Sequence, residues 1–264
     1  MKYIRGFMMA WGMFCWIPCP YKKWNEADRG AQLAMLPLLG ACMGAICCLI
    51  WWPMAQTSAN PILIGALLAG IYFLLTGFIH LDGFMDCSDA VMPRHPQMEE
   101  RQRILKDSTV GAFAVICMVL VAMIFAASWA SVGWVFSLAT SAAFVMVFTL
   151  SRMVSVVTVM SVRAMTGSQY SQTSDPSGAD ITVAVLTGAV FLVLAMIIGR
   201  GDSFMAGILP GQLIVAIVAA VTILSGLLVG LFDRKKLGGM NGDISGHMIT
   251  VSEMCGLIAI ALLN

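Results

Sequence analysis

Long apolar tracts without Asp, Glu, Lys or Arg alternate with short polar segments along the chain. Four charge-free tracts run over residues 30–81, 108–151, 181–199 and 203–232. Since a helix needs about 20 apolar residues to cross a bilayer, the first two tracts each hold two spans, divided at the Pro and Asn residues of 53–61 and near Gly133. The predicted spans are about 31–52, 61–81, 110–131, 134–151, 181–199, 208–232 and 244–263.

This pattern predicts an all-α fold, a polytopic integral membrane helical bundle of about seven transmembrane helices in one domain over residues 1–264. A barrel is excluded because its strands alternate apolar and polar residues. The first 20 residues form a shorter apolar run behind Lys2 and Arg5, without a small-residue cleavage site. At about 12 to 14 residues it is too short to span, so we expect an interfacial or re-entrant helix. The alternative is a loosely held amphipathic tail.

Composition and charge support a membrane location. The chain is 59% hydrophobic and 11% charged, whereas about a quarter of the residues of a soluble domain are charged. A net charge of +1 leaves no general basic surface, so we expect no nucleic-acid partner. Every Lys and Arg except Arg200 falls on one side of the predicted topology, which predicts a cytoplasmic N-terminus and an outer C-terminus.

The eight cysteines lie mostly inside apolar tracts and show no repeated C-x-x-C pair. We therefore expect small buried hydrophobic side chains rather than a zinc or disulfide framework.

Three aspartates follow the second predicted span at helical spacing. If the helix continues, the offsets of 0, 4 and 7 place Asp82, Asp86 and Asp89 on one face. Three carboxylates on one stripe repel one another unless a divalent cation such as Mg²⁺ joins them, often with substrate phosphate oxygens. A solvated helix end is the alternative. On the same helix His80 points about 160° away from Asp82, which favours a packing or positioning role unless Gly83 breaks the helix.

Two further polar segments add candidate groups. In the first, Glu99/Arg103 and Arg103/Asp107 have the spacing of surface ion pairs, while Lys106 and Asp107 adjoin the third span, where they could hold a diphosphate and complete a metal shell. The second, residues 238–243, enters the last span.

At the start of that span Asp243 is either an N-cap or a further metal ligand. Glu253 lies about 15 Å deeper, where an ionisable group is costly and usually functional. Arg152 is its plausible partner, a phosphate clamp, or a side chain that snorkels to the interface.

Together, three motifs resemble a known family. They are HLDGFMDCSDA at 80–90, RILKDSTVGAF at 103–113 and GGMNGDISGHMITVSE at 238–253. In this order and within a polytopic chain they resemble the cobalamin synthases, the adenosylcobinamide-GDP ribazoletransferases of vitamin B12 biosynthesis. One departure is Ala90-Val91, where many members have Gly soon after the third Asp.

The resemblance implies a Mg²⁺-dependent transfer that joins adenosylcobinamide-GDP to α-ribazole or its 5′-phosphate and releases GMP. It also implies a multi-pass protein of the bacterial inner membrane with its site facing the cytoplasm, and the chain could form a homo-oligomer. We expect the metal ligands to be Asp82, Asp86, Asp89 and Asp243. We expect catalytic roles for Asp82, Asp86, Asp89, Lys106, Asp107 and Glu253. We expect substrate contacts from His80, Gly83, Arg103, Gly111, Arg152, Gly242 and Gly246.

Three alternatives fit less well. A CDP-alcohol phosphotransferase would have an Ala-Arg pair after Asp82-Gly83, where this chain has Phe84-Met85-Asp86, and a prenyltransferase would have an Asn-Asp motif that is missing. An ion-coupled transporter would place its acids near the bilayer midplane, whereas most of these acids cluster at one face.

Overall fold

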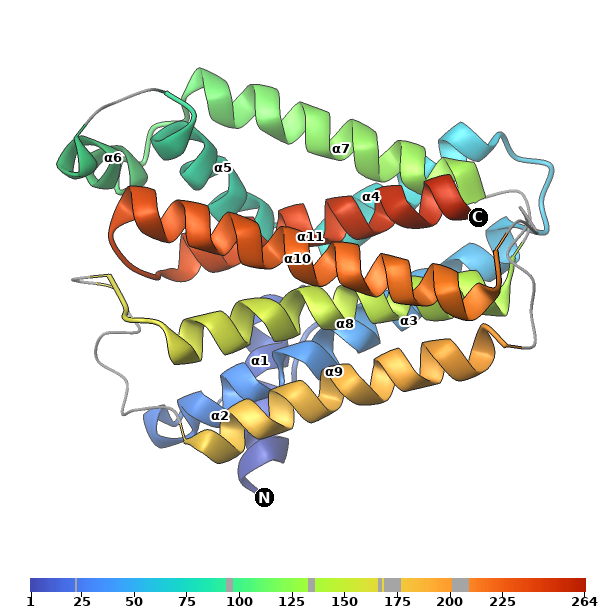
Figure 1. Ribbon diagram of the computed structural model, residues 1–264, viewed down its shortest axis with the longest axis horizontal. Helices are drawn as coiled ribbons and strands as arrows, with labels where there is room; N and C mark the ends of the chain where they lie inside the picture. The colour runs from blue at the N-terminus through green and yellow to red at the C-terminus, as the bar shows by residue number, and fades with distance from the viewer. Residues whose placement is uncertain (22, 94–96, 133–135, 166–167, 169–176, 201–208) are drawn as a thin grey trace.

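A computed structural model describes residues 1–21, 23–93, 97–132, 136–165, 168, 177–200 and 209–264 (Figure 1). In this part of the chain the backbone is helical, with one isolated bridge between Ala164 and Met240. The elements are α1 (Lys2–Phe14), η1 (Glu26–Asp28), α2 (Arg29–Ala34), α3 (Leu36–Met54), α4 (Pro61–Leu75), α5 (Ile79–Val91), α6 (Met98–Leu105), α7 (Ala112–Val132), α8 (Leu138–Ser161), α9 (Gly178–Ile198), α10 (Gly211–Leu237) and α11 (Gly242–Leu263).

Six of these helices, α3, α7, α8, α9, α10 and α11, are long and apolar enough to cross a membrane. They run side by side along the long axis of the molecule (Figure 1). Helix α8 lies at the centre, against α3, α9, α10 and α11, and most of its apolar window is buried. Helices α7 and α9 leave most of their surfaces open at the periphery, where lipid covers such surfaces. The all-α polytopic membrane bundle is therefore confirmed.

The span expected at 61–81 is not one straight helix. It divides into α4 and α5, whose axes differ by 92°. Gly77 and Phe78 join the two helices in the left-handed backbone region, with φ of 58° and 60°, and such residues stop a right-handed helix. With α4 and α5 counted together as one broken span, the total reaches the expected seven.

The span expected at 134–151 is longer at its C-terminal end. Helix α8 continues through Arg152 to Ser161, while residues 134 and 135 lie outside the described part. The sequence suggests an end at Arg152 because a lone charge marks a membrane boundary. In the fold this arginine is fully buried and paired with Glu253, so the charge does not end the apolar helix.

The other span boundaries agree to within a few residues. The exceptions are the start of the first span, where Met35 separates the short α2 from α3, and the end of the sixth, where α10 continues past 232 to Leu237.

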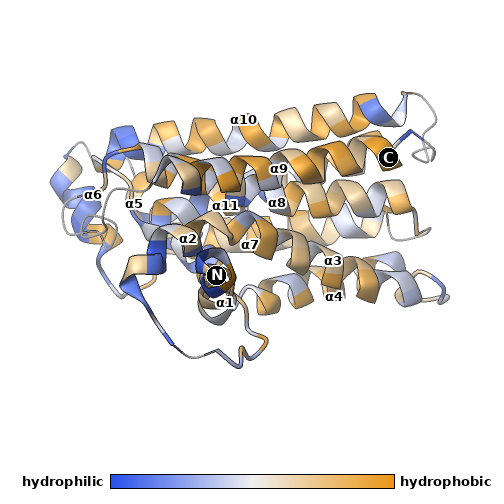
Figure 2. Ribbon diagram, turned by 90° about the horizontal axis from the view of Figure 1, so that it is seen from below, coloured by the Kyte–Doolittle hydropathy of each residue, from blue (hydrophilic) through white to orange (hydrophobic). Residues whose placement is uncertain are grey.

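Helix α1 crosses the direction of the long helices, as Figures 1 and 2 show. Its 13 residues match the expected short N-terminal helix. Two ion pairs hold it: Lys2 Nζ lies 2.9 Å from Asp180 Oδ1, and Arg5 Nε lies 2.7 Å from Asp28 Oδ2. Hydrogen bonding to Arg5 lowers the pKa of Asp28. A loosely held tail is therefore wrong for this segment.

Hydrophilic residues gather at the end of the bundle where α6 lies (Figure 2). We call this the α6 end. The C-terminus lies at the other end (Figure 1). The candidate residues of α5, α6 and the start of α11 all occupy the α6 end.

Candidate active site

Helices α5 and α11 cross in close contact at the α6 end. A Cβ atom on Gly83 would lie 2.8 Å from Asp243 Cα, and one on Gly246 would lie 2.9 Å from the His80 carbonyl oxygen. Such distances are too short for any side chain, so both glycines are required by the helix crossing. Gly83 and Gly246 are expected to contact the substrate. In the structure they also have a packing role, because the close crossing that they allow brings Asp243 beside the aspartates of α5.

The stripe of aspartates on α5 is intact. Helix α5 runs unbroken through Gly83, and Asp86 lies within electrostatic range of Asp82, Asp89 and Asp243. The side chain of Asp82 is exposed, while Asp86 and Asp243 are half-buried. Carboxylates from two helices thus lie within electrostatic range at one end of the bundle. Among the described residues no three of these carboxylates place an oxygen within 4.8 Å of one another, so a shared divalent ion would require the side chains to turn toward it.

Asp243 is not the N-cap of α11. Asn241 holds that position: its Oδ1 accepts a hydrogen bond from Ile244 N at 2.9 Å, and its Nδ2 donates to Asp243 Oδ2 at 2.7 Å. Asp243 therefore stands in the first turn, where a helix N-terminus stabilises negative charge. Gly242, another expected substrate contact, is the first residue of the same helix.

Asp89 is engaged differently from the other aspartates. Its Oδ2 accepts a hydrogen bond from Gly111 N at 2.7 Å, and its Oδ1 accepts one from Ala114 N at 2.9 Å. The carboxylate therefore caps the start of α7. A Cβ on Gly111 would lie 2.8 Å from Asp89 Oδ2, so this glycine allows the cap to form.

The segment after α6 presents two exposed charged groups. Lys106 ends the helix with its side chain in solvent. Asp107 Oδ1 accepts hydrogen bonds from Thr109 N at 2.9 Å and Thr109 Oγ1 at 2.6 Å, and these bonds lower the pKa of Asp107. Of the two ion pairs expected for Arg103, the one with Glu99 is replaced by a pair with Glu100 at i,i+3, with Nη2 2.7 Å from Oε1. Asp107 remains within electrostatic range of Arg103.

His80 is buried at the start of α5. Its ring stacks on Phe14 of α1 with centroids 5.7 Å apart, and its carbonyl oxygen accepts a hydrogen bond from Thr250 Oγ1. These contacts agree with the packing role suggested by its position on the helix. They join α1, α5 and α11.

Glu253 and Arg152 form a separate network in the core. Glu253 Oε1 accepts hydrogen bonds from Arg152 Nη1 at 2.5 Å, Tyr72 Oη at 2.7 Å and Ser151 Oγ at 3.0 Å. Arg152 Nη2 also donates to Tyr72 Oη at 3.0 Å. Of the roles considered for Arg152, the structure places it as the partner of Glu253, and both side chains are buried.

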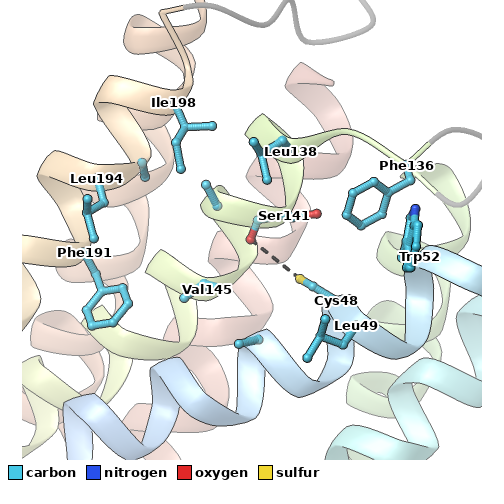
Figure 3. A pocket seen from close by; sticks show the side chains of 13 residues that line it. Cys48, Leu49, Trp52, Phe136, Leu138, Ser141, Val145, Phe191, Leu194 and Ile198 are labelled. Atoms are coloured by element: carbon cyan, nitrogen blue, oxygen red, sulfur yellow. Dashed lines mark hydrogen bonds between the residues drawn. The ribbon is translucent and has the colours of Figure 1, made fainter.

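Two cavities lie away from the carboxylates. One, of about 430 Å³, opens between α3, α8 and α9 near Trp52, Leu138 and Ile198 (Figure 3). These residues lie toward the end opposite α6, and the described walls, apolar apart from Ser141 and Cys48, carry no charged group for an anionic phosphate. The other, of about 560 Å³, lies beside α1, with walls that include Met8, Met13, Tyr21, Lys23 and Trp24.

Sequence reasoning missed two buried polar groups, Tyr72 and Asp233, and the contact of Asp233 with the partly exposed His247. Tyr72 is an isolated phenol within an apolar span, which was the available signal for a buried hydrogen bond. Asp233 directly precedes Arg234, Lys235 and Lys236 and looks like part of a solvated charge cluster, yet it is fully buried. Its Oδ2 lies 2.7 Å from His247 Nδ1.

The fold and the site define a polytopic membrane protein with acidic side chains of two helices gathered at one end. Comparison with known proteins narrows this class. The chain matches the cobalamin-5-phosphate synthase family over residues 6–261 and belongs to that family.

Relatives named adenosylcobinamide-GDP ribazoletransferase share the full length of the chain. The Clostridium perfringens protein is 29% identical over 262 residues, covering 99% of both chains. The Clostridium botulinum protein is 30% identical over 265 residues, covering 98% of this chain and 97% of its own. The Lachnoclostridium phytofermentans protein is 26% identical over 267 residues, covering 99% and 95%. No solved structure matches the chain.

Proposed function

We propose that this protein is an adenosylcobinamide-GDP ribazoletransferase. It joins adenosylcobinamide-GDP to α-ribazole or its 5′-phosphate and releases GMP, in the biosynthesis of cobalamin. The observation that carries the proposal is the family match over residues 6–261. The meeting of the α5 and α11 carboxylates at one end of the bundle supports it, because transfer from a diphosphate needs its negative charge balanced.

The carboxylates fit Mg²⁺ by their chemistry. Magnesium prefers oxygen ligands and is commonly bound by one or two carboxylates together with substrate phosphates. Asp82, Asp86 and Asp243 would hold the ion, while Asp89, whose oxygens both accept backbone N–H groups, fixes the start of α7 beside them. When bound, Mg²⁺ supplies positive charge against the diphosphate and the departing GMP.

The side chains around this cluster have separate tasks. The exposed Lys106 is free to swing toward the diphosphate and hold its oxygens as the GMP charge develops. A ribose hydroxyl of α-ribazole attacks the phosphorus attached to the cobinamide arm and loses its proton to a carboxylate. Asp107 is a weak base because its pKa is lowered by Thr109, and Glu253 is occupied by three donors. We therefore assign the proton to a carboxylate of the Asp82, Asp86 and Asp243 cluster that is not coordinated to the ion at that moment.

The orientation follows from the placement of basic residues. The α6 end carries many of the Lys and Arg residues, including Arg101, Lys106, Arg163 and residues 234–236, and such an excess supports a cytoplasmic location for this end. We place the site at the cytoplasmic face of the bacterial inner membrane. There it is open to water-soluble GDP-linked substrates. Cysteine labelling from either side of sealed vesicles at Glu99 on α6 and at Asn264 would test this placement.

The experiment for the reaction uses the purified full chain in detergent with adenosylcobinamide-GDP, α-ribazole and Mg²⁺. Release of GMP is expected, and chelation of Mg²⁺ should stop it reversibly. The Asp82→Ala variant should lose the activity while keeping the elution volume and helical circular dichroism of the parent. Glu99→Ala, at an exposed acid of α6 outside the cluster, is the matched control and should remain active. Normal turnover by Asp82→Ala would refute the assignment of the cluster.

A further inference from the structure

A second cluster of ligand-type side chains lies behind the aspartate stripe. Cys87 of α5, Asp233 of α10 and His247 of α11 bring a sulfur, a carboxylate oxygen and a ring nitrogen within 4.8 Å of one another. Cys87 and Asp233 are fully buried, whereas the His247 side chain keeps 15% of its surface exposed. Helix α5 and the consecutive helices α10 and α11, which lie far from it in sequence, therefore converge on one small polar volume.

Asp233 is not satisfied by the groups around it. Its Oδ2 lies 2.7 Å from His247 Nδ1. Its Oδ1 is buried and has no hydrogen-bond partner among the described residues. Leaving a buried carboxylate oxygen without a hydrogen bond reduces the stability of the fold by about 1–3 kcal/mol or more. Asp233 Oδ1 thus has no donating or positively charged partner among the described residues, at a place where ligand atoms already gather.

The three donor types point to one class of ion. A thiolate, an imidazole and a carboxylate are the protein ligands of Zn²⁺, with bonds of about 2.0–2.3 Å. Mg²⁺ instead prefers oxygen donors, as the neighbouring aspartate cluster offers. Three protein ligands leave a fourth tetrahedral position for water, and the partly exposed His247 gives an ion a route to the cluster.

We propose that Cys87, Asp233 and His247 bind a divalent cation of the zinc type, separate from the ion of the aspartate cluster. Binding displaces the proton of the Cys87 thiol and uses the lone pair of one His247 nitrogen. The ion cross-links α5 to α10 and α11. Because Cys87 directly follows Asp86, this link fixes the helix that carries the aspartates, so the site positions the cluster and takes no part in the transfer. The lack of a C-x-x-C spacing concealed it from sequence analysis.

Cobalt titration of the full chain in detergent tests the site, since Co²⁺ replaces Zn²⁺ and reports its ligands by absorption. After chelator treatment and with Mg²⁺ in excess, one Co²⁺ per chain should bind and give a sulfur-to-cobalt charge-transfer band with the intense visible bands of tetrahedral cobalt. Added Zn²⁺ should displace the Co²⁺ and so remove both the charge-transfer band and the visible bands. Cys87→Ser should lose the charge-transfer band, and His247→Ala should bind Co²⁺ at least about tenfold more weakly.

Two control variants distinguish this site from binding at another cysteine and from binding at the aspartate cluster. Cys255→Ser alters another cysteine, on α11, and should keep the full spectrum. Asp82→Asn should keep it as well, although that variant is expected to stop GMP release, so this inference and the proposed function can fail independently. Absence of stoichiometric binding, a charge-transfer band that persists in Cys87→Ser, or loss of binding in Asp82→Asn would each overturn the proposal. If Cys87→Ser does not fold, the His247→Ala titration decides, because its side chain is partly exposed.

Discussion

The buried pair of Arg152 and Glu253 allows a sharp test of what holds the bundle together. Replacing Arg152 with Leu removes the positive charge and leaves the Glu253 carboxylate buried between α4, α8 and α11. The hydroxyls of Tyr72 and Ser151 still donate to it at 2.7 and 3.0 Å. Neither hydroxyl carries a charge, so the carboxylate stays uncompensated in a medium of low dielectric constant.

Loss of one partner of a buried ion pair costs about 3–5 kcal/mol. At about 2–4 °C of Tm for each kcal/mol in a chain of this size, Arg152→Leu should lower Tm by roughly 6–20 °C. Glu253→Gln should lower the stability by a similar amount, because it leaves the buried Arg152 guanidinium without a negatively charged partner. The double variant Arg152→Leu/Glu253→Leu removes both charges and should recover much of the loss, since an apolar replacement of a buried pair is often neutral.

The assay is thermal unfolding in detergent, followed by far-ultraviolet circular dichroism and by tryptophan fluorescence, alongside GMP release at a low temperature. Arg103→Leu is the matched control, since Arg103 is exposed and its pair with Glu100 lies on the surface, and its Tm should stay near that of the parent. The reasoning is refuted if Arg152→Leu keeps the parent Tm while the KM for adenosylcobinamide-GDP rises. That result would make Arg152 a phosphate clamp.

Two other predictions concern the packing around the aspartates. Gly83→Ala places a methyl group 2.8 Å from Asp243 Cα and should cost about 1–3 kcal/mol together with most of the GMP release. Gly70→Ala, with no atom within 4 Å of the new methyl, should be neutral or stabilising by thermal unfolding, and equal behaviour of the two variants would contradict the crossing argument. Asp89→Ala removes the cap of α7 and should lower stability by about 0.5–2 kcal/mol, measured by urea unfolding of detergent-solubilised protein, whereas Asp82→Ala should not. A stable Asp89→Ala protein would argue against the cap.

The fold class and the family followed from local features of the sequence. A long tract without charged residues indicates a membrane span because each ionisable side chain in the hydrocarbon costs several kcal/mol. This cost does not depend on which helices pack against the tract. The stripe of Asp82, Asp86 and Asp89 followed from helical spacing alone. The structure confirmed the spacing, and the α5–α11 crossing at Gly83 and Gly246 supplied the packing that brings the expected Asp243 to the same end. Only the structure showed that the start of α7 engages both oxygens of Asp89.

The tertiary structure decided which ionisable side chains are buried and which partners they contact. From the sequence, Arg152 marks the end of a span and Glu253 looks like a functional acid, while Asp233, next to three basic residues, carries no signal of its own. The fold buries all three: the first two pair with each other across α8 and α11, and the third approaches His247. Burial of an ionisable group depends on partners from distant segments, since its desolvation must be offset by atoms that sequence spacing does not specify. Hydropathy therefore determined which segments form the bundle, and packing determined which polar groups stabilise it and which remain for chemistry.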